Sequence, residues 1–300
     1  MKSILSISNL SKSFARVHAV KDLSFDVYKG DVFAFLGSNG SGKTTTIRCL
    51  LDIYQPDEGE LLIKGEKYSY KLNEYIGYLP EERGIYTRVK VIDLFVYFAT
   101  LRGISKSKAK KLSEQYLERV DLIDHKEQKI AKLSSGMQQK AQIGMAILHR
   151  PEILILDEPF KGLDPVNRQL FIEIFKELNG AGTTIMYSTH VIDEAQKMAN
   201  RLIIIDEGEE QVYGTQEEVR RSYGKDNIHI QFAGKFPQES KLFDARIVNQ
   251  SAEITPAKGV NPQEILNFLV DKNVKLLEFK IDYPGLNEIF IKISKHNHNK

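Results

Sequence analysis

Cysteine is almost absent from the 300 residues, because Cys49 is the only one. A single cysteine excludes an intrachain disulfide, and no Cys/His group has the spacing of a zinc site. An excess of one charge sign is also missing, since 42 lysines and arginines face 40 acids and the net charge is +2. The chain thus lacks the broad cationic field of nucleic-acid-binding proteins, and we expect a reducing cytoplasm and no nucleic-acid partner.

Long hydrophobic runs are missing as well. The most apolar stretch, Val91–Leu101, is too short to cross a bilayer about 30 Å thick, and it contains Asp93. Residues 1–6 alternate polar and apolar side chains without the apolar block of a secretory signal, which favours an edge strand. We therefore expect any membrane role to need another subunit.

Short apolar runs recur along the chain, and helical patterns such as 166–178 and 191–198 separate them. These runs, which have the length of buried parallel strands, lie at 32–36, 153–156, 184–187 and 202–205. The alternation predicts an α/β fold with a parallel sheet wrapped by helices. Residues 3–7 and 21–27 alternate like half-exposed strands, and residues from about 87 to 150 predict an inserted helical subdomain.

The chain is expected to hold two domains. Turn signals follow residue 205, and a short polar helix at 216–221 is predicted to close a first domain that covers residues 1–222. Residues 224–227, Gly-Lys-Asp-Asn, are the expected boundary. Strand-like alternation and helical spacing then predict a small α+β domain over residues 225–300.

A phosphate-binding loop is predicted at residues 37–44, Gly-Ser-Asn-Gly-Ser-Gly-Lys-Thr, which fit the pattern G-x-x-x-x-G-K-[ST] between a buried strand and a helix. The glycines allow backbone N–H groups to converge on phosphates, Lys43 neutralises the outer phosphates, and Thr44 offers a hydroxyl to Mg²⁺. The expected nucleotide contacts are Gly37, Ser38, Asn39, Gly40, Ser41, Gly42, Lys43, Thr44 and Thr45.

Two carboxylates, Asp157 and Glu158, follow the apolar run 153–156. Neighbouring like charges at the end of a buried strand favour a cation or substrate that offsets them, although a purely structural pair is the alternative. We assign Asp157 to the Mg²⁺ shell and Glu158 to the attacking water. His190 follows another apolar run and should reach the same sheet edge, close to the γ-phosphate, unless it only caps a helix.

A further segment, residues 133–140 with the sequence Leu-Ser-Ser-Gly-Met-Gln-Gln-Lys, precedes a helical run. Taken by itself it is a serine-capped helix start. However, the chain also contains the phosphate loop before this segment and, after it, the acid pair, Gly162-Leu163-Asp164 and His190. With its motifs in this order, the chain resembles the ATPase subunit of ABC transporters over residues 1 to about 222. The resemblance implies a P-loop NTPase fold with a mixed sheet core, a helical subdomain and antiparallel N-terminal strands.

The resemblance also implies a head-to-tail dimer that encloses two ATP molecules. In it, Ser134 and Gly136 contact the γ-phosphate held by the partner's phosphate loop, and Asp164 lies across the interface. Phe14 is placed to stack on adenine, or else belongs to the core. The sequence departs from the usual pattern in two segments. Ser135 and Met137 replace a glycine and a glutamine in the segment 133–140, and Glu81 replaces a glutamine beside the metal. We expect Thr44, Asp157 and Glu81 around Mg²⁺.

The run 80–86, Pro-Glu-Glu-Arg-Gly-Ile-Tyr, and the appended domain resemble the branch of two-component exporters for sodium extrusion and drug export. The implied function is an ATP-hydrolysing motor, peripheral on the inner face of the membrane and coupled to a separate transmembrane permease. A groove containing Phe95, Tyr97 and Phe98 would receive that subunit, unless these residues form ordinary core. The alternatives are a soluble ABC-type ATPase acting on ribosomes or DNA, and a nucleotide-dependent binding module without hydrolysis.

Overall fold

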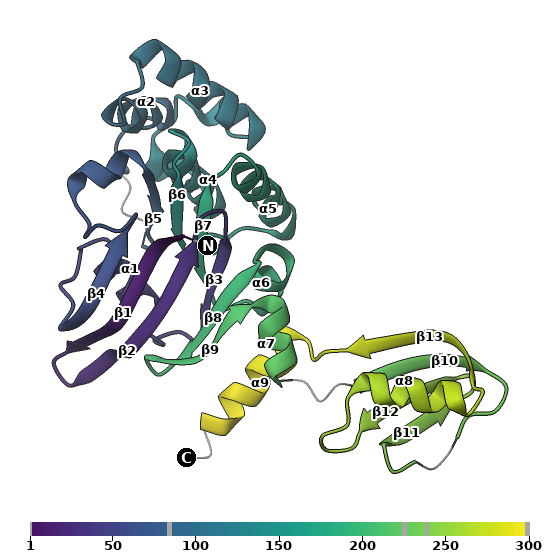
Figure 1. Ribbon diagram of the computed structural model, residues 1–300. Coiled ribbons are helices and arrows are strands. Elements are labelled where there is room, and N and C mark those ends of the chain that lie inside the picture. The colour runs from purple at the N-terminus through teal and green to yellow at the C-terminus, as the bar shows by residue number, and fades with distance from the viewer. Residues whose placement is uncertain (1, 83–85, 224–226, 238–239, 298–300) are drawn as a thin grey trace. The chain divides into compact units, whose positions relative to one another are not determined.

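A computed structural model describes residues 2–82, 86–223, 227–237 and 240–297 of the chain (Figure 1). The contacts divide it into two compact units, Met1–Tyr213 and Gly214–Lys300, and each is described by itself. Within the described residues no helix has both the length and the apolar character needed to cross a membrane. Residues 83–85 and 224–226, which belong to the predicted exporter run and domain boundary, lie outside the described part.

The first unit is built on a six-stranded sheet with the order β5-β6-β7-β3-β8-β9. Its strands are β3 (Val32–Gly37), β5 (Ile76–Leu79), β6 (Ile153–Asp157), β7 (Thr184–Thr189), β8 (Arg201–Asp206) and β9 (Glu209–Thr215). The strands from β5 to β8 pair in parallel, and the two-residue turn between β8 and β9 makes that pair antiparallel. The four predicted apolar runs thus form the centre of a mixed sheet, with their carboxyl ends at one edge.

Both faces of this sheet are covered. Phe33 and Phe35 pack on one face against α1 (Lys43–Leu50) and a three-stranded antiparallel sheet with the order β2-β1-β4. That sheet contains β1 (Ser3–Phe14), β2 (Val17–Tyr28) and β4 (Glu58–Ile63). On the other face, Tyr187 meets Phe160, and Phe160 meets Phe175 of α5 (Pro165–Gly180). Side chains of successive strand residues point to opposite faces, so both apolar layers come from the same runs.

The predicted helical subdomain contains α2 (Val91–Leu101), α3 (Lys106–Arg119) and α4 (Ser135–Ile147). Phe95 of α2 packs on Tyr116 of α3 with ring centroids 5.6 Å apart. Gly144 of α4 allows this contact, because a Cβ atom there would lie 2.2 Å from the Tyr116 ring. Phe95 is therefore fully buried, and its prediction as a groove residue is wrong. Tyr97 is half exposed, whereas Phe98 lines a surface cavity.

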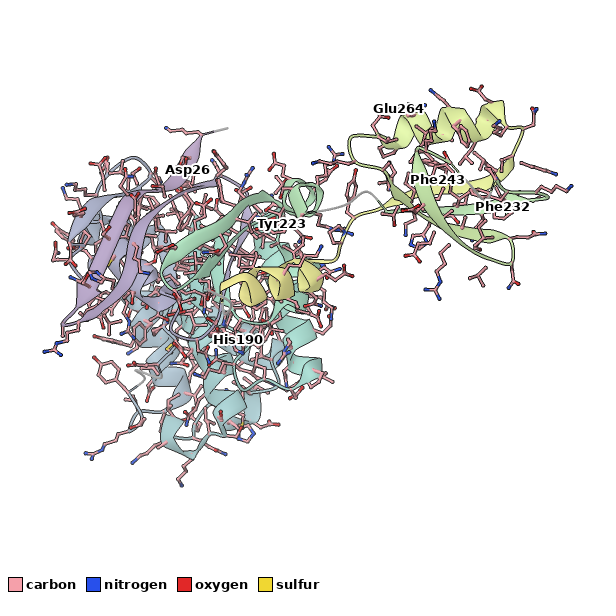
Figure 2. All side chains as sticks on the ribbon, turned by 90° about the horizontal axis from the view of Figure 1, so that it is seen from below. Asp26, His190, Tyr223, Phe232, Phe243 and Glu264 are labelled. Atoms are coloured by element: carbon pink, nitrogen blue, oxygen red, sulfur yellow. The ribbon has the colours of Figure 1, made fainter. Side chains whose placement is uncertain are left out.

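The second unit contains a four-stranded antiparallel sheet with the order β11-β12-β10-β13. Its elements are α7 (Gln216–Tyr223), β10 (Asn227–Ala233), β11 (Phe243–Val248), β12 (Ser251–Pro256), α8 (Pro262–Asp271), β13 (Lys275–Asp282) and α9 (Leu286–Asn297). Ile265 and Leu269 of α8 pack on inward side chains of the sheet that include Phe232 and Phe243 (Figure 2). The opposite face presents polar residues such as His229 and Glu253.

Helix α7 was predicted to close the first domain, but the structure groups it with the second unit. Its Arg220 donates hydrogen bonds to the carbonyl oxygens of Tyr283 and Pro284 at 3.1 Å each, just before α9 begins. Arg221 lies over the Tyr283 ring, 5.8 Å from its centroid. These contacts group α7 with the second unit, although 60 residues of chain separate it from its partners.

Candidate nucleotide-binding site

The loop between β3 and α1 has the backbone that a phosphate loop requires. Gly42 caps α1 with φ 105°, and a Cβ atom there would lie 2.5 Å from the carbonyl oxygen of Ala19. Only glycine suits this position, because it combines a left-handed conformation with close backbone packing. The helix then begins at Lys43, so its free N–H groups point into the loop.

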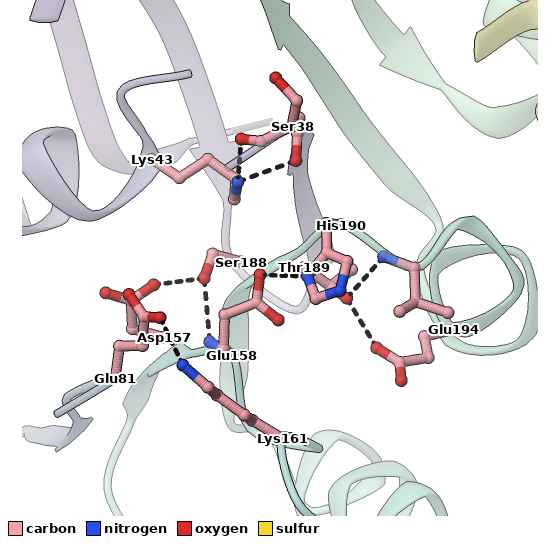
Figure 3. A network of polar contacts seen from close by, with 12 residues as sticks. Ser38, Lys43, Glu81, Asp157, Glu158, Lys161, Ser188, Thr189, His190 and Glu194 are labelled. Atoms are coloured by element: carbon pink, nitrogen blue, oxygen red, sulfur yellow. Dashed lines mark hydrogen bonds and ion pairs between the residues drawn. The ribbon is translucent and has the colours of Figure 1, made fainter. Parts of the chain in front are cut away.

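The side chain of Lys43 is turned onto its own loop. Its Nζ donates to the carbonyl oxygens of Gly37 and Ser38 at 2.8 Å each (Figure 3). Burial lowers the pKa of Lys43, while the nearby carboxylates of Glu158, Asp157 and Glu81 oppose that shift. A desolvated ammonium group beside free backbone N–H groups is well suited to an anion.

A cavity of about 380 Å³ opens in front of the loop. Its lining combines backbone and side chains of the predicted loop with two acids from other segments: Asn39, Gly40, Gly42, Lys43, Thr44, Thr45, Glu81 and Glu158. The structure therefore brings the central part of the predicted phosphate loop together with two of the three predicted acids, even though more than 100 residues separate the loop from Glu158.

Asp157 lies at the end of β6 and is almost fully buried. One of its carboxylate oxygens accepts a hydrogen bond from the Ser188 hydroxyl, whereas Oδ2 has no hydrogen-bond partner within the described residues (Figure 3). Burial is the main cause that raises the pKa of Asp157. A buried carboxylate oxygen without a partner calls for a compensating donor or cation.

The donor set around Asp157 fits a hard divalent cation. Carboxylate and hydroxyl oxygens are available from Asp157 and Thr44, and the Thr44 hydroxyl is 3.3 Å from Glu81 Oε2. Over the described residues, no three His, Cys, Asp or Glu side chains form a complete metal cage. Magnesium commonly binds through one or two protein groups and takes its remaining ligands from phosphates and water.

Glu158 adopts a left-handed backbone conformation, which is uncommon for a glutamate. Its φ is 51°, and its N–H donates to the Ser188 hydroxyl at 3.0 Å. Its carboxylate accepts a hydrogen bond from His190 Nδ1 at 2.9 Å. The left-handed conformation costs about 1–2 kcal/mol in a non-glycine residue and is stabilised here by the surrounding hydrogen bonds. The predicted proximity of Glu158 and His190 is thus present in the structure.

A buried network holds the backbone beside His190. Thr189 donates to Glu194 Oε2 at 2.7 Å and accepts the N–H of Val191 at 3.0 Å. Arg168 of α5 lies 3.3 Å from Glu194 Oε1, and burial raises the pKa of Glu194. Sequence analysis missed Ser188 and Glu194, although two polar residues at the end of the 184–187 run were a usable signal for Ser188.

Glu81 reaches the pocket from the segment after β5. Its Oε1 accepts a hydrogen bond from Lys161 at 2.8 Å, and its Oε2 accepts one from Thr44. The Lys161 hydrogen bond is the first cause that lowers the pKa of Glu81, so the carboxylate is negatively charged at neutral pH. Lys161 was not found in the sequence, because nothing in its local pattern distinguishes it from a surface lysine.

The remaining predicted nucleotide contacts do not line this pocket. Ser134 caps α4 and accepts the N–H of Met137 at 3.3 Å, and Gly136 lies in the first turn of that helix. Asp164 caps α5 through the N–H of Asn167 at 2.9 Å. The side chains of Ser134 and Asp164 are exposed. Phe14 is 41% exposed at the end of β1 and meets the Tyr54 ring edge-on at 5.2 Å.

Known families match both units. Residues 20–161 match the ABC transporter family, and residues 214–294 match the C-terminal domain of DrrA1-3-like ATP-binding proteins. The ABC transporter ATP-binding protein YhaQ of Bacillus subtilis is 38% identical over 291 residues, covering 96% of this chain and 97% of the relative. The bacitracin transport ATP-binding protein BcrA of Bacillus licheniformis is 32% identical, with 98% of each chain covered.

The fold of the chain is also similar to that of ABC transporter ATP-binding subunits. A solved ATP-binding subunit of an ABC transporter superimposes with a TM-score of 0.68 at 28% identity, covering 74% of this chain and 94% of that one. The loop, the acid pair and the sheet order thus belong to an ATP-binding cassette. The chain is a member of the ABC transporter ATP-binding protein family, whose cassettes hydrolyse ATP to drive transport.

Proposed function

We propose that the chain binds Mg-ATP between two copies arranged head to tail and works as the motor of an exporter with a separate transmembrane permease. The observation that carries this proposal is the arrangement of Glu158. Its carboxylate is bonded to His190 at 2.9 Å and lines the same cavity as Lys43 and Thr44. A base and a phosphate-binding helix N-terminus therefore border one cavity, and His190 holds the base from outside the lining.

The residues of the pocket have distinct proposed roles. The backbone of residues 37–45 and the Lys43 ammonium group bind the phosphates. Thr44, Asp157 and Glu81 hold the magnesium ion, which supplies charge neutralisation for the phosphate oxygens. Glu158 orients the attacking water and accepts its proton. His190 keeps the Glu158 carboxylate in place and lies within reach of the terminal phosphate.

The dimer is proposed because part of the nucleotide-binding set is exposed and absent from the cavity. Ser134 stands at the N-terminus of α4, where a hydroxyl and free N–H groups favour an anion. Asp164 is exposed beside Val166, a large apolar side chain that is 79% exposed. A second copy would supply Ser134 and Gly136 to the terminal phosphate and cover Val166, while Phe14 would stack on adenine.

The proposed membrane partner would bind beside Phe98. A cavity of about 190 Å³ lies there, lined in part by Tyr78, Pro80 and Met145. Its lining combines these apolar side chains with the polar groups of Arg102, Gln142 and His149, and this mixture suits an amphipathic helix of another protein. The names of relatives concern bacitracin transport and linearmycin resistance, and they support an export role with this chain peripheral on the inner face of the membrane.

Replacing Glu158 with glutamine tests the central role. We expect Glu158→Gln to lower ATP turnover by about 10²–10⁴-fold, because the general base is lost while shape is kept. Affinity for a fluorescent ATP analogue should be retained or become tighter, since the phosphate contacts remain and one carboxylate of the cavity lining loses its charge. Light scattering should show more dimer in the presence of ATP.

The matched control is Glu152→Gln, which neutralises an exposed acid that is paired with Lys64 and does not line the pocket. It should keep wild-type turnover. Turnover within about threefold of wild type in Glu158→Gln would refute the assignment of the base. A loss of nucleotide binding in Glu158→Gln would refute the proposal that Glu158 acts in hydrolysis and is not needed for binding.

A further inference from the structure

Lys161 joins the two acidic segments that border the nucleotide pocket. Its Nζ donates to Glu81 Oε1 at 2.8 Å, and its backbone N–H donates to the carbonyl oxygen of Glu158 at 3.2 Å. The same Glu81 carboxylate accepts the Thr44 hydroxyl at 3.3 Å through Oε2. One carboxylate therefore links Lys161, which Figure 3 shows beside Glu81, to the Thr44 hydroxyl in the first turn of α1.

The charges of the cavity are unfavourable for a polyanion without this lysine. Counted over the part of the chain that the structure describes, the cavity lining contains two carboxylates, Glu81 and Glu158, and one ammonium group, that of Lys43. Asp157 adds a third, buried acid that interacts electrostatically with both of them. Each carboxylate near a triphosphate repels it, and the repulsion is strongest where water is partly excluded. Lys161 lies outside the lining but directly on Glu81, so it supplies the second positive charge.

We propose that Lys161 is a positioning residue that neutralises Glu81 and holds its carboxylate beside Thr44, so that this additional acid does not weaken nucleotide binding. The inference rests on the proposed function of the pocket. It assigns Lys161 no contact with the phosphates, because its bonding partner is Glu81. The charge of Lys161 and the charge of Glu81 should consequently act on nucleotide binding with opposite signs.

Because the Lys161–Glu81 ion pair is exposed, its loss should change nucleotide binding more than folding stability. The Lys161 side chain is 58% exposed and that of Glu81 is 34% exposed. Such surface ion pairs contribute little to folding stability. The loss of Lys161 should therefore leave thermal unfolding nearly unchanged and act on the bound polyanion. Salt should screen the effect, because the Debye length falls from about 14 Å to about 4 Å between 50 and 500 mM.

The test is a double-mutant cycle on the full chain with a fluorescent ATP analogue. Binding is measured without divalent cations at 50 mM salt, so that the metal does not contribute. We expect Lys161→Met to weaken binding about tenfold and Glu81→Gln to tighten it about tenfold, or 1.4 kcal/mol each. The double variant should bind within about twofold of wild type, and at 500 mM salt both single effects should fall below about threefold.

Two controls separate compensation from damage to the fold. Lys161→Arg keeps the charge and should bind like wild type. Lys64→Met breaks a comparable surface pair, Lys64–Glu152 at 2.8 Å, away from the cavity, and it should have no effect on binding. Unchanged binding in Lys161→Met would overturn the inference. It would also be overturned if Lys161→Met and Glu81→Gln both weakened binding, because a structural role predicts the same sign.

Lys43→Ala distinguishes failure of this inference from failure of the proposed function. If wild type binds nucleotide and Lys43→Ala loses it, the pocket is correct, and the cycle alone decides on Lys161. If wild type and Lys43→Ala bind equally, the pocket assignment fails, and the inference about Lys161 fails with it.

Discussion

Two cavities of different composition flank the short segment 78–81. On one side, Glu81 borders the nucleotide cavity of about 380 Å³, where charged groups are linked to one another by hydrogen bonds. On the other side, Tyr78 and Pro80 border the smaller cavity of about 190 Å³ beside Phe98. A segment of four residues therefore connects the two sites: Tyr78 and Pro80 border the proposed partner site, and Glu81 borders the nucleotide site.

Both cavities leave buried polar atoms without a partner within the described residues. Around the nucleotide cavity, Ser188 serves both Asp157 and Glu158, but Asp157 Oδ2 has no partner. In the smaller cavity, Arg102 Nη1 and Gln142 Oε1 are buried without partners within the described residues. Buried polar groups without partners are costly, and a bound protein can supply the missing hydrogen bonds. The comparison teaches that the first cavity needs a cation or a donor at Asp157, and we propose that the second is completed by hydrogen bonds from a partner protein.

The largest expected effect concerns the nucleotide cavity. Lys43→Ala should weaken nucleotide binding at least about 100-fold, near 3 kcal/mol, because among the described residues it removes the only ammonium group of the cavity lining. Titration with a fluorescent ATP analogue measures this loss, and Lys64→Met is the control. Unchanged affinity in Lys43→Ala would show that the larger cavity is not the phosphate site, and the distinction between the two cavities would then be lost.

Ser188→Ala should have the next largest effect. The change leaves Asp157 Oδ1 and the Glu158 N–H without their hydroxyl partner in a fully buried place. We expect a loss of about 1–3 kcal/mol in the free energy of unfolding, together with reduced turnover. Urea unfolding and an ATPase assay measure both quantities.

The control is Ser113→Ala, whose buried hydroxyl donates only to the Ala109 carbonyl oxygen of its own helix. Its loss should cost less than about 1 kcal/mol and leave turnover unchanged. Equal losses of stability in the two variants would mean that the Ser188 contacts do not organise the acid pair.

The smaller cavity should respond to pH through His149. Burial is the main cause that lowers the pKa of His149 from 6.5 to about 4, and the charge of Arg102 acts in the same direction. The unfolded chain therefore takes up a proton before the folded chain does, so stability is complete above pH 6.5 and is lost as pH falls toward 4. Between pH 7 and pH 5 the loss from this residue is about 2 kcal/mol.

Urea unfolding of wild type and His149→Gln at both pH values measures this contribution. Glutamine retains a donor for the Ile76 carbonyl oxygen, which His149 Nε2 contacts at 3.2 Å, but it does not titrate. The variant should lose about 2 kcal/mol less than wild type on acidification. Parallel losses would show that His149 is not held neutral in the fold.

The smallest effect is expected from Phe98→Asp in the isolated chain. The new charge alters the apolar cavity without touching the phosphate loop, so the affinity for nucleotide should change by less than about twofold. Titration with the same ATP analogue measures this. A tenfold change would show that the two cavities communicate in the absence of a partner.

The sequence predicted those parts of the site whose signal is local. The glycines and Lys43 form one continuous motif, and Asp157 and Glu158 are adjacent in the chain. Lys161 and Ser188 were missed because their importance depends on which loops the sheet brings together. Phe95 was assigned to a groove because helical spacing alone does not tell which face of α2 is covered by α3. Likewise, α7 was grouped with the wrong neighbours because its contacts to Tyr283 and Pro284 are distant in sequence.

The left-handed conformation of Glu158 has a consequence for how this protein can vary. Glycine would relax the backbone at this position, and a chain selected only for heat resistance would tend to acquire it. Retention of a large acidic side chain there means that the polypeptide tolerates a weak point in its architecture at the end of β6. Backbone stability and the proposed chemistry thus compete at Glu158, because glycine there would relax the backbone and remove the base.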